Sequence, residues 1–292
     1  MTKETPDTLA KKNSYRSFLL NVRNLPSIPV IMYEVTKLLS NPNTSASDLG
    51  RLISKDQGLV AKILTVANSP LYGLPRRVST IEFAIVILGF DHIKNIVVAL
   101  SMIEAFKSHR SKRWDSTNYW EHSLLTASAA KRIADDLGYP KSSEVFTAGL
   151  LHDLGISIIQ RYFFPEFNAI CDMVEEQQIR FLNAEEKVLG LTHQEIGQIL
   201  ATIWNLPQSL GDVIAHHHYP SRSEQNKVIA SIIHLADYMT QRLQVGNFNW
   251  DDNMELDMNI LKILRFRDEA HFNQFIENYD ELFRVHSESI VL

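Results

Sequence analysis

Cysteine is almost absent from this sequence, whose 292 residues contain only Cys171. No intramolecular disulfide can form, so we expect neither a disulfide-stapled secreted protein nor a cysteine-based metal site. Long apolar runs are also missing, because no stretch approaches the roughly 18 residues of a membrane-spanning helix. Residues 1–18 are charged and lack the apolar segment of a signal peptide. We therefore expect a protein of the reducing cytoplasm that does not interact with membranes.

Positive charge is outnumbered by negative charge, with 29 Lys and Arg against 34 Asp and Glu and a formal net charge of −5. A phosphate backbone would be repelled by this balance, so nucleic-acid binding is disfavoured. Residues 48–68 can be interpreted as two short helices joined at a glycine, which is one arrangement found in DNA-binding proteins. Their outward cations are mainly Lys55 and Lys62, with Asp56 between them, and ordinary bundle packing is the better interpretation.

Apolar residues are plentiful, at 45% of the chain, and they recur at helical spacing almost throughout. Breaks between the helical patterns are well marked: Asn41-Pro42 ends one helix, Asp91 can cap another, and Gly138 closes the helix that contains His122. The predicted fold class is all-α, a multi-helix bundle preceded by an N-terminal helical block. A polar, basic stretch at 107–117 separates the two parts, and the region after Gln244 is expected to contain short closing helices.

The second part, predicted to span 111–292, holds an unusual concentration of metal-capable side chains. The adjacent pair His152-Asp153 is predicted to lie within a helix, where the two side chains point about 100° apart and meet one metal site only if other helices close around it. Each of the predicted helices that carries such a side chain buries one face, so the metal-capable groups should face a shared interior. The candidate metal ligands are His122, His152, Asp153, His193, His217, His218 and Asp237.

Buried imidazoles and carboxylates need partners, and a divalent cation satisfies several of them at once. Nitrogen and oxygen ligands without thiolate suit iron, manganese, nickel or zinc, of which we favour iron or manganese. One helical histidine is more often a satisfied core residue than a ligand. The prediction of a metal site therefore depends on five separate segments that offer ligands for the same kind of ion.

Several longer segments resemble the HDOD family, the HD-related output domains. The resemblance covers nearly the whole length of the chain, and its most specific part runs from Asn-Ser-Pro-Leu-Tyr-Gly to Ile-Leu-Gly. The matching segments are 25–39, 53–73, 78–98, 146–155, 192–207 and 213–220.

This resemblance implies an all-helical protein of the HD superfamily, related to HD phosphohydrolases and to HD-GYP phosphodiesterases, which hydrolyse cyclic dinucleotides at a metal centre. Most HDOD proteins look like degenerate relatives without demonstrated catalysis, and many have lost the ligands. By the motif, all seven candidate residues named above fall on HD-GYP-like ligand positions, Asp237 through the segment His-Leu-Ala-Asp-Tyr, while His216 is an extra histidine before the pair.

The chain also departs from the HD-GYP pattern. Ile156 stands where a phosphate-binding lysine follows the glycine of the HD motif, and Tyr219-Pro220 follows the histidines without the glycine-rich turn. Asn118 occupies the position of a carboxylate found in some three-metal relatives, so we expect two ions rather than three. Arg161 is the cation nearest to the HD motif in the sequence, and helix geometry gives no reason to expect that its side chain points toward the site.

Two functions remain open from the sequence, and no catalytic residue can be assigned. The first is a metal-binding signalling or regulatory module without efficient catalysis, whose partner is a signalling protein or a small phosphorylated ligand. The second is a metal-dependent phosphohydrolase that acts on a cyclic dinucleotide or a nucleotide through a dinuclear centre. Met32 and Met102 in the first part can line a partner groove, although core packing is the commoner role of such residues, and self-association into a homodimer stays open.

Overall fold

The computed structural model describes residues 6–21, 29–105, 113–242 and 254–289, and every element within these ranges is helical. The predicted all-α class is therefore confirmed. Helix α7 (Ser116–Asp136) ends just before Gly138, whose φ of 68° is easily adopted by glycine. The prediction that Asp91 caps a helix is wrong, because α6 (Phe90–Ala105) starts before this residue and Asp91 lies in its first turn.

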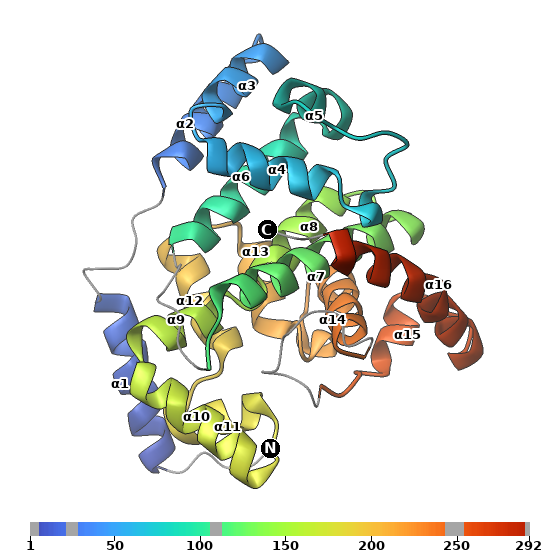
Figure 1. Cartoon of the computed structure of the whole chain (residues 1–292). Coiled ribbons are helices and arrows are strands. Elements are labelled where there is room, and N and C mark those ends of the chain that lie inside the picture. The colour runs from blue at the N-terminus through green and yellow to red at the C-terminus, as the bar shows by residue number, and fades with distance from the viewer. Residues whose placement is uncertain (1–5, 22–28, 106–112, 243–253, 290–292) are drawn as a thin grey trace.

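The first group of helices forms the upper part of the molecule in Figure 1, and α6 runs from it toward the remaining helices. Side chains that accept backbone hydrogen bonds set the starts of three of these helices. The caps are Ser45 for α3, Asp56 for α4 and Thr80 for α5. The helices are α2 (Val30–Leu39), α3 (Ala46–Ile53), α4 (Gln57–Ala67), α5 (Ile81–Leu88) and α6.

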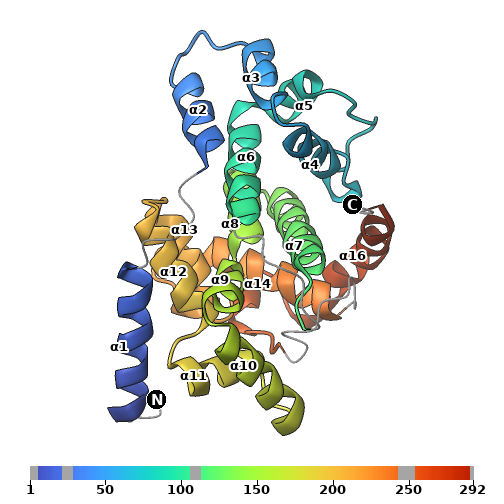
Figure 2. The same cartoon turned by 60° about the vertical axis from the view of Figure 1, so that its left-hand side comes forward.

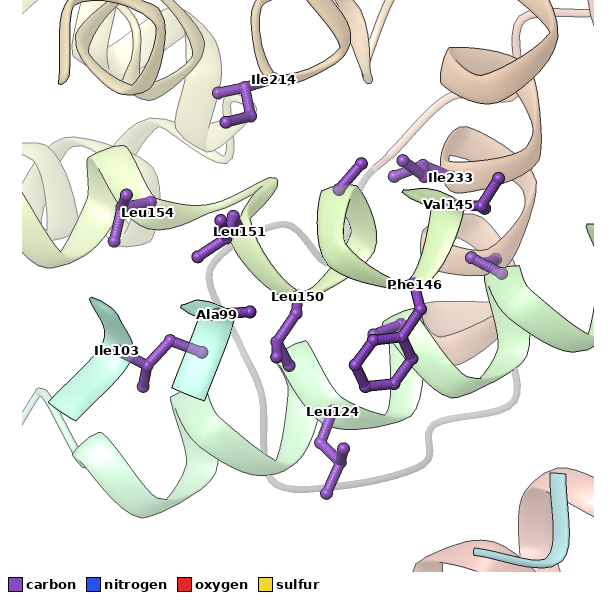
Figure 3. Close-up of a cluster of buried hydrophobic side chains, with 14 of the residues drawn as sticks. Ala99, Ile103, Leu124, Val145, Phe146, Leu150, Leu151, Leu154, Ile214 and Ile233 are labelled. Atoms are coloured by element: carbon purple, nitrogen blue, oxygen red, sulfur yellow. The ribbon is translucent and has the colours of Figure 1, made fainter. Parts of the chain in front are cut away.

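The second group surrounds α8 (Ser142–Leu151), whose side chains form the centre of the hydrophobic core (Figure 3). Around it lie Leu124 of α7, Ala99 of α6 and Ile233 of α14, all fully buried. The other helices of this group are α9 (Leu154–Tyr162), α10 (Phe164–Gln177), α11 (Phe181–Leu189), α12 (His193–Ile203), α13 (Gln208–His216) and α14 (Lys227–Arg242). Since α8 touches helices from both parts of the chain, the two parts share one core.

The two terminal helices pack on different sides of the second group (Figure 2). Helix α1 (Pro6–Asn21) lies along α11 and α12. After α15 (Asn259–Ile263), α16 (Glu269–Ser289) lies against α7 and the short helix η1 (Pro70–Tyr72).

Of the short closing helices expected after Gln244, α15 has five residues as expected, whereas α16 is long, with 21 residues. Buried Phe272, Ile276 and Phe283 give it a continuous apolar stripe. The hydroxyl of Tyr279 donates a 2.6 Å hydrogen bond to Asp136 of α7, which adds a polar contact to this packing.

The predicted boundary between 1–110 and 111–292 falls within 106–112, which lies outside the described residues. Among the helices that are described, none is by itself long and apolar enough to cross a membrane. Helices α5 and α6 reach that length and hydropathy only as a pair, and they are bent by 118°.

Candidate metal centre

The structure brings all seven predicted metal-capable side chains together from five segments of the chain. His122 comes from the middle of α7, His193 is the first residue of α12, and Asp237 lies in α14. The two remaining segments supply the pair at 152–153 and the pair at 217–218, which directly follows α13. Each of the seven residues is at most 4% exposed, so the cluster belongs to the interior of the protein.

His152 and Asp153 do not lie within one helix, contrary to the prediction. His152 is the C-cap of α8 and Asp153 is the N-cap of α9, so the pair occupies the break between the two helices. Gly155 follows at the start of α9, where a Cβ atom would stand 2.0 Å from the backbone oxygen of His193. Only glycine therefore allows α9 to approach α12 this closely.

The ligand atoms fall into two groups, and within each group they all lie within 4.8 Å of one another. Group A consists of Asp153, His193, His217 and His218, and group B of His122, His152 and Asp237.

Within group A, the Nε2 atom of His193 lies 3.3 Å from Nε2 of His217 and 3.1 Å from Nε2 of His218. Within group B, the Nε2 atom of His122 lies 3.4 Å from Nε2 of His152 and 3.3 Å from Oδ1 of Asp237. The imidazole nitrogens of each group thus converge on one point.

The carboxylate of Asp153 connects the two groups. Its Oδ1 lies 3.4 Å from Nε2 of His193 and 3.5 Å from Nε2 of His217. Its Oδ2 lies 3.3 Å from Nε2 of His152 and 3.6 Å from Nε2 of His122. One carboxylate therefore presents one oxygen to each group.

Hydrogen bonds on the far side of the rings decide which nitrogens can accept an ion. Nδ1–H of His152 donates to the carbonyl of Gly149 at 2.6 Å, and Nδ1–H of His217 donates to the carbonyl of Ile214 at 2.8 Å. Because a carbonyl only accepts, each neutral ring has its lone pair on Nε2, which faces the cluster. Lone pairs that face one another across about 3 Å repel unless a positive charge lies between them.

The spacing also suits a divalent ion. Two ligand atoms that each lie ~2.1 Å from one ion at tetrahedral or octahedral angles are ~3.0–3.4 Å apart. The nitrogen–nitrogen distances of both groups fall in this range. The residues present therefore fit two ions, with the ligands of each drawn from one group and Asp153 available to both.

Two buried residues that support the centre were missed by the sequence analysis. Glu185 of α11 accepts hydrogen bonds from both the backbone N–H and the Nδ1–H of His193. His234 donates from Nδ1 to the carbonyl of His217 and accepts at Nε2 from the backbone N–H of Asp257. Glu185 could have been found, because it falls on the apolar face of its helix, between buried Leu182 and Leu189.

The charges in the cluster are balanced by the histidines. Burial alone would raise the pKa of Asp153, but His152 and His193 hold it well below its ordinary range. Burial alone would lower the pKa of His152, but Asp153 and Asp237 raise it to about 9. Burial lowers the pKa values of His217 and His218. The carboxylates of Asp153 and Asp237 thus require positive charge beside them. Protonated His152 supplies this charge, and a divalent ion can take the place of that proton.

Other residues singled out in the sequence lie outside the cluster. His216 donates from Nδ1 to the backbone oxygen of Asp212 at 2.8 Å and also contacts its carboxylate at 3.0 Å. Ile156 is 1% exposed and packs in the core. Arg161 donates to the carbonyl of Ala105 at 2.8 Å, so its guanidinium is held at the end of α6.

Comparison with solved structures supports the fold. An HDOD domain protein with unknown function from Geobacter sulfurreducens is 27% identical and superimposes with a TM-score of 0.79, covering 98% of this chain and 100% of that one. A Shewanella amazonensis SB2B protein provisionally named a metal-dependent phosphohydrolase is 18% identical with a TM-score of 0.65, covering 95% of this chain and 99% of that one. At that identity the second similarity concerns the fold alone.

Among curated proteins, an uncharacterized protein of Treponema pallidum (strain Nichols) is 24% identical over 255 residues. The match covers 85% of this chain and 47% of that protein, so the chain spans about half the length of this relative. The HDOD domain family matches residues 25–220, a range that holds six of the seven side chains of the centre. Because this match covers more than half of the sequence, the chain belongs to the HDOD family.

Proposed function

We propose that this protein is a metal-binding regulatory module of a signalling pathway, with two divalent ions, preferably iron or manganese, bound by groups A and B. The enclosure of the ligands carries this proposal, since none of the seven residues is more than 4% exposed. Structural metal sites are closed by protein ligands, whereas catalytic sites keep a position open for water or substrate. With Asp153 shared, each group offers four protein ligands, and the burial of all seven side chains is what favours binding over turnover.

The chain's own residues prepare the centre for an ion. Gly149 and Ile214 fix the rings of His152 and His217 through their carbonyls. Glu185 does the same for His193 and adds a negative charge behind the ring, which raises the basicity of its Nε2. A bound divalent ion would supply the positive charge that these lone pairs and carboxylates require, and it would act as a Lewis acid.

A phosphohydrolase is the second candidate, and the position of Asp153 favours it. A carboxylate with one oxygen toward each of two ligand groups is typical of two-metal sites, in which the ions lie about 3.5–4 Å apart. The provisional name of the structurally similar Shewanella amazonensis protein points in the same direction. The substrate would then be a cyclic dinucleotide or a nucleotide, and access to the ligands would require the surrounding helices to open.

Elemental analysis of protein purified without added metal tests the proposed function. We expect about two ions per chain, near-complete loss in Asp153→Ala and partial loss in His152→Ala. The matched control is His216→Ala, since His216 belongs to the same run of histidines but pairs with Asp212 outside the two groups. Metal-free wild-type protein of native fold, or equal metal in Asp153→Ala and wild type, would disprove metal binding.

Assays of the metal-loaded protein separate the two candidates. Incubation with cyclic dinucleotides and with nucleotides should give no turnover that depends on Asp153 if the protein is a regulatory module. Hydrolysis that disappears in Asp153→Ala and persists in His216→Ala would establish the phosphohydrolase instead. For the regulatory role, the expected partner is a signalling protein or a small phosphorylated ligand.

A further inference from the structure

His216 lines a separate pocket of about 500 Å³. The pocket is formed by α12, α13 and the short helix η2 (Pro220–Arg222), together with residues 205–207 and 224–226. Its volume lies within the ~300–1,000 Å³ of typical small-molecule sites. None of the seven metal-centre residues lines it.

Asp212 and His216 form a built pair at this pocket. Nδ1–H of His216 donates to the backbone oxygen of Asp212 at 2.8 Å, and Nδ1 lies 3.0 Å from Oδ1 of the same residue. The other oxygen, Oδ2, accepts from the hydroxyl of Ser223 at 2.7 Å and from the amide of Asn226 at 2.8 Å. The carboxylate is therefore satisfied by the protein, and the Nε2 edge of His216 is left to interact with a ligand.

The same contacts argue against two other uses of the pair. The hydroxyl of Ser223 donates to Asp212 and not to His216, so the three residues are not arranged as a serine nucleophile with its base. Among the described residues, His216 and Asp212 are not joined by a third ligand in a group that could hold a metal ion.

Arg222 gives the pocket a flat surface. Its guanidinium carbon lies 4.2 Å from the centroid of the Tyr219 ring, and the ring supports the guanidinium from one side. Arg222 lines the pocket while Tyr219 does not, so the Tyr219 ring supports Arg222 without being part of the pocket lining. Planar guanidinium groups held in this way are surfaces on which nucleic-acid bases stack.

The remaining lining is rich in carboxamides, which both donate and accept hydrogen bonds. Such groups recognise the edges of bases, where donors and acceptors alternate. The carboxamide residues of the pocket are Gln198, Asn205, Gln208, Gln225 and Asn226. Asp212 and Glu224 offset the charge of Arg222, which favours an uncharged head group over a bare anion.

We propose that this pocket binds a nucleobase-containing small molecule, with the base stacked on Arg222 and its polar edge bonded to His216 and the carboxamides. The binding site is distinct from the metal centre. Its test therefore does not depend on whether groups A and B hold ions.

The experiment measures binding of adenosine, guanosine, cytidine and uridine, each separately, to the full chain by calorimetry and saturation-transfer NMR. We expect at least one nucleoside to bind with a dissociation constant of about 1 mM or lower, while ribose does not bind. Arg222→Lys keeps the charge but removes the plane, so binding should weaken at least about tenfold. Arg267→Lys, at an exposed arginine outside the pocket, is the matched control and should bind like wild type.

Two further variants locate the ligand. His216→Asn should weaken binding of the same nucleoside, whereas Asp153→Ala should leave it unchanged, with circular dichroism used to verify that each variant is folded. The proposal fails if no nucleoside binds, if ribose binds as well as the nucleosides, or if Arg222→Lys retains wild-type affinity. Loss of binding in Asp153→Ala but not in Arg222→Lys would place the nucleoside at the metal centre and overturn the proposal.

Discussion

The Glu185 carboxylate receives two hydrogen bonds from His193, and its Oε2 lies 2.9 Å from both the backbone nitrogen and Nδ1 of that residue. The first bond satisfies one of the N–H groups that the start of α12 leaves without a helical partner. The second holds the imidazole ring so that its Nε2 faces His217 and His218. Burial raises the pKa of Glu185, whereas its contacts with His193 oppose this rise. These contacts therefore favour the charged form of the buried carboxylate.

Glu185→Gln should weaken metal binding by about 10–100-fold, the usual cost of losing a carboxylate behind a histidine ligand. The amide can still accept one hydrogen bond, so the fold should be retained. The measurement is a competition titration with a coloured chelator, and Glu186→Gln at the exposed neighbouring position serves as control. Equal affinities in the two variants would show that Glu185 does not support the centre.

Removing the metal should lower the thermal stability of the protein. A ligand present at about 1,000 times its dissociation constant stabilises the folded state by ~4 kcal/mol. For a chain of this size that corresponds to roughly 8–16 °C in Tm. Differential scanning calorimetry before and after chelation measures the change, and Asp153→Ala should melt at the lower temperature under both conditions. A Tm unaffected by removal of bound metal would contradict this expectation.

Gly155→Ala should destabilise the protein by about 2–4 kcal/mol, because the added methyl group would overlap the backbone of His193 and force α9 away from α12. Gly211→Ala is the appropriate comparison, since its Cβ would meet the Ala201 side chain at 3.4 Å, an ordinary contact distance. Urea unfolding should show a large loss for the first variant and a small change for the second. Metal affinity should fall with Gly155→Ala alone.

His92 should make the folded state sensitive to acid. Its Nε2 lies 2.7 Å from the Tyr72 hydroxyl, and burial, with a smaller contribution from Lys131, lowers its pKa to about 3, while Asp135 opposes this effect. Between pH 6.5 and about 3 the unfolded chain binds one more proton at His92 than the folded protein does. The free energy of unfolding therefore falls as the pH is lowered through 6.5, by up to ~1.4 kcal/mol per pH unit from this residue.

His92→Gln tests this pH dependence, because glutamine can accept the Tyr72 hydrogen bond and does not titrate. Between about pH 7 and pH 5, the variant should lose ~2 kcal/mol less stability than the wild type does. Urea titrations at several pH values measure both proteins. Parallel pH profiles would mean that the pKa of His92 does not differ between the folded and unfolded states.

The fold class followed from the sequence because helical spacing of apolar residues and glycine stops such as Gly138 are local signals. The ligand set could also be assembled in advance, since a histidine or aspartate on an apolar face needs a partner. The helix break at His152 could not be seen, because the apolar pattern continues through it from Leu151 to Leu154. Just after the break, Gly155 lies against the backbone of His193, a tertiary contact that the local apolar pattern does not contain.

The division of the ligands into two groups was likewise hidden from the sequence. It depends on the direction of each ring, which is set by a hydrogen bond on the far side of that ring, as from Nδ1–H of His193 to the Glu185 carboxylate. The sequence does not show which of the nearby acceptors each ring nitrogen uses. For the same reason His216 could only be noted as an extra histidine, although its ring turns toward Asp212.

The position of Asp153 at the junction of α8 and α9 has a consequence for how the two groups fill. Oδ1 of Asp153 would help to hold an ion in group A, and because the carboxylate is planar and rigid, Oδ2 would then stay directed at group B. The first ion would therefore order the Asp153 carboxylate that the second ion also requires, and loading should be cooperative. Any signal that changes the angle between α8 and α9 would therefore change metal binding at group A and at group B together.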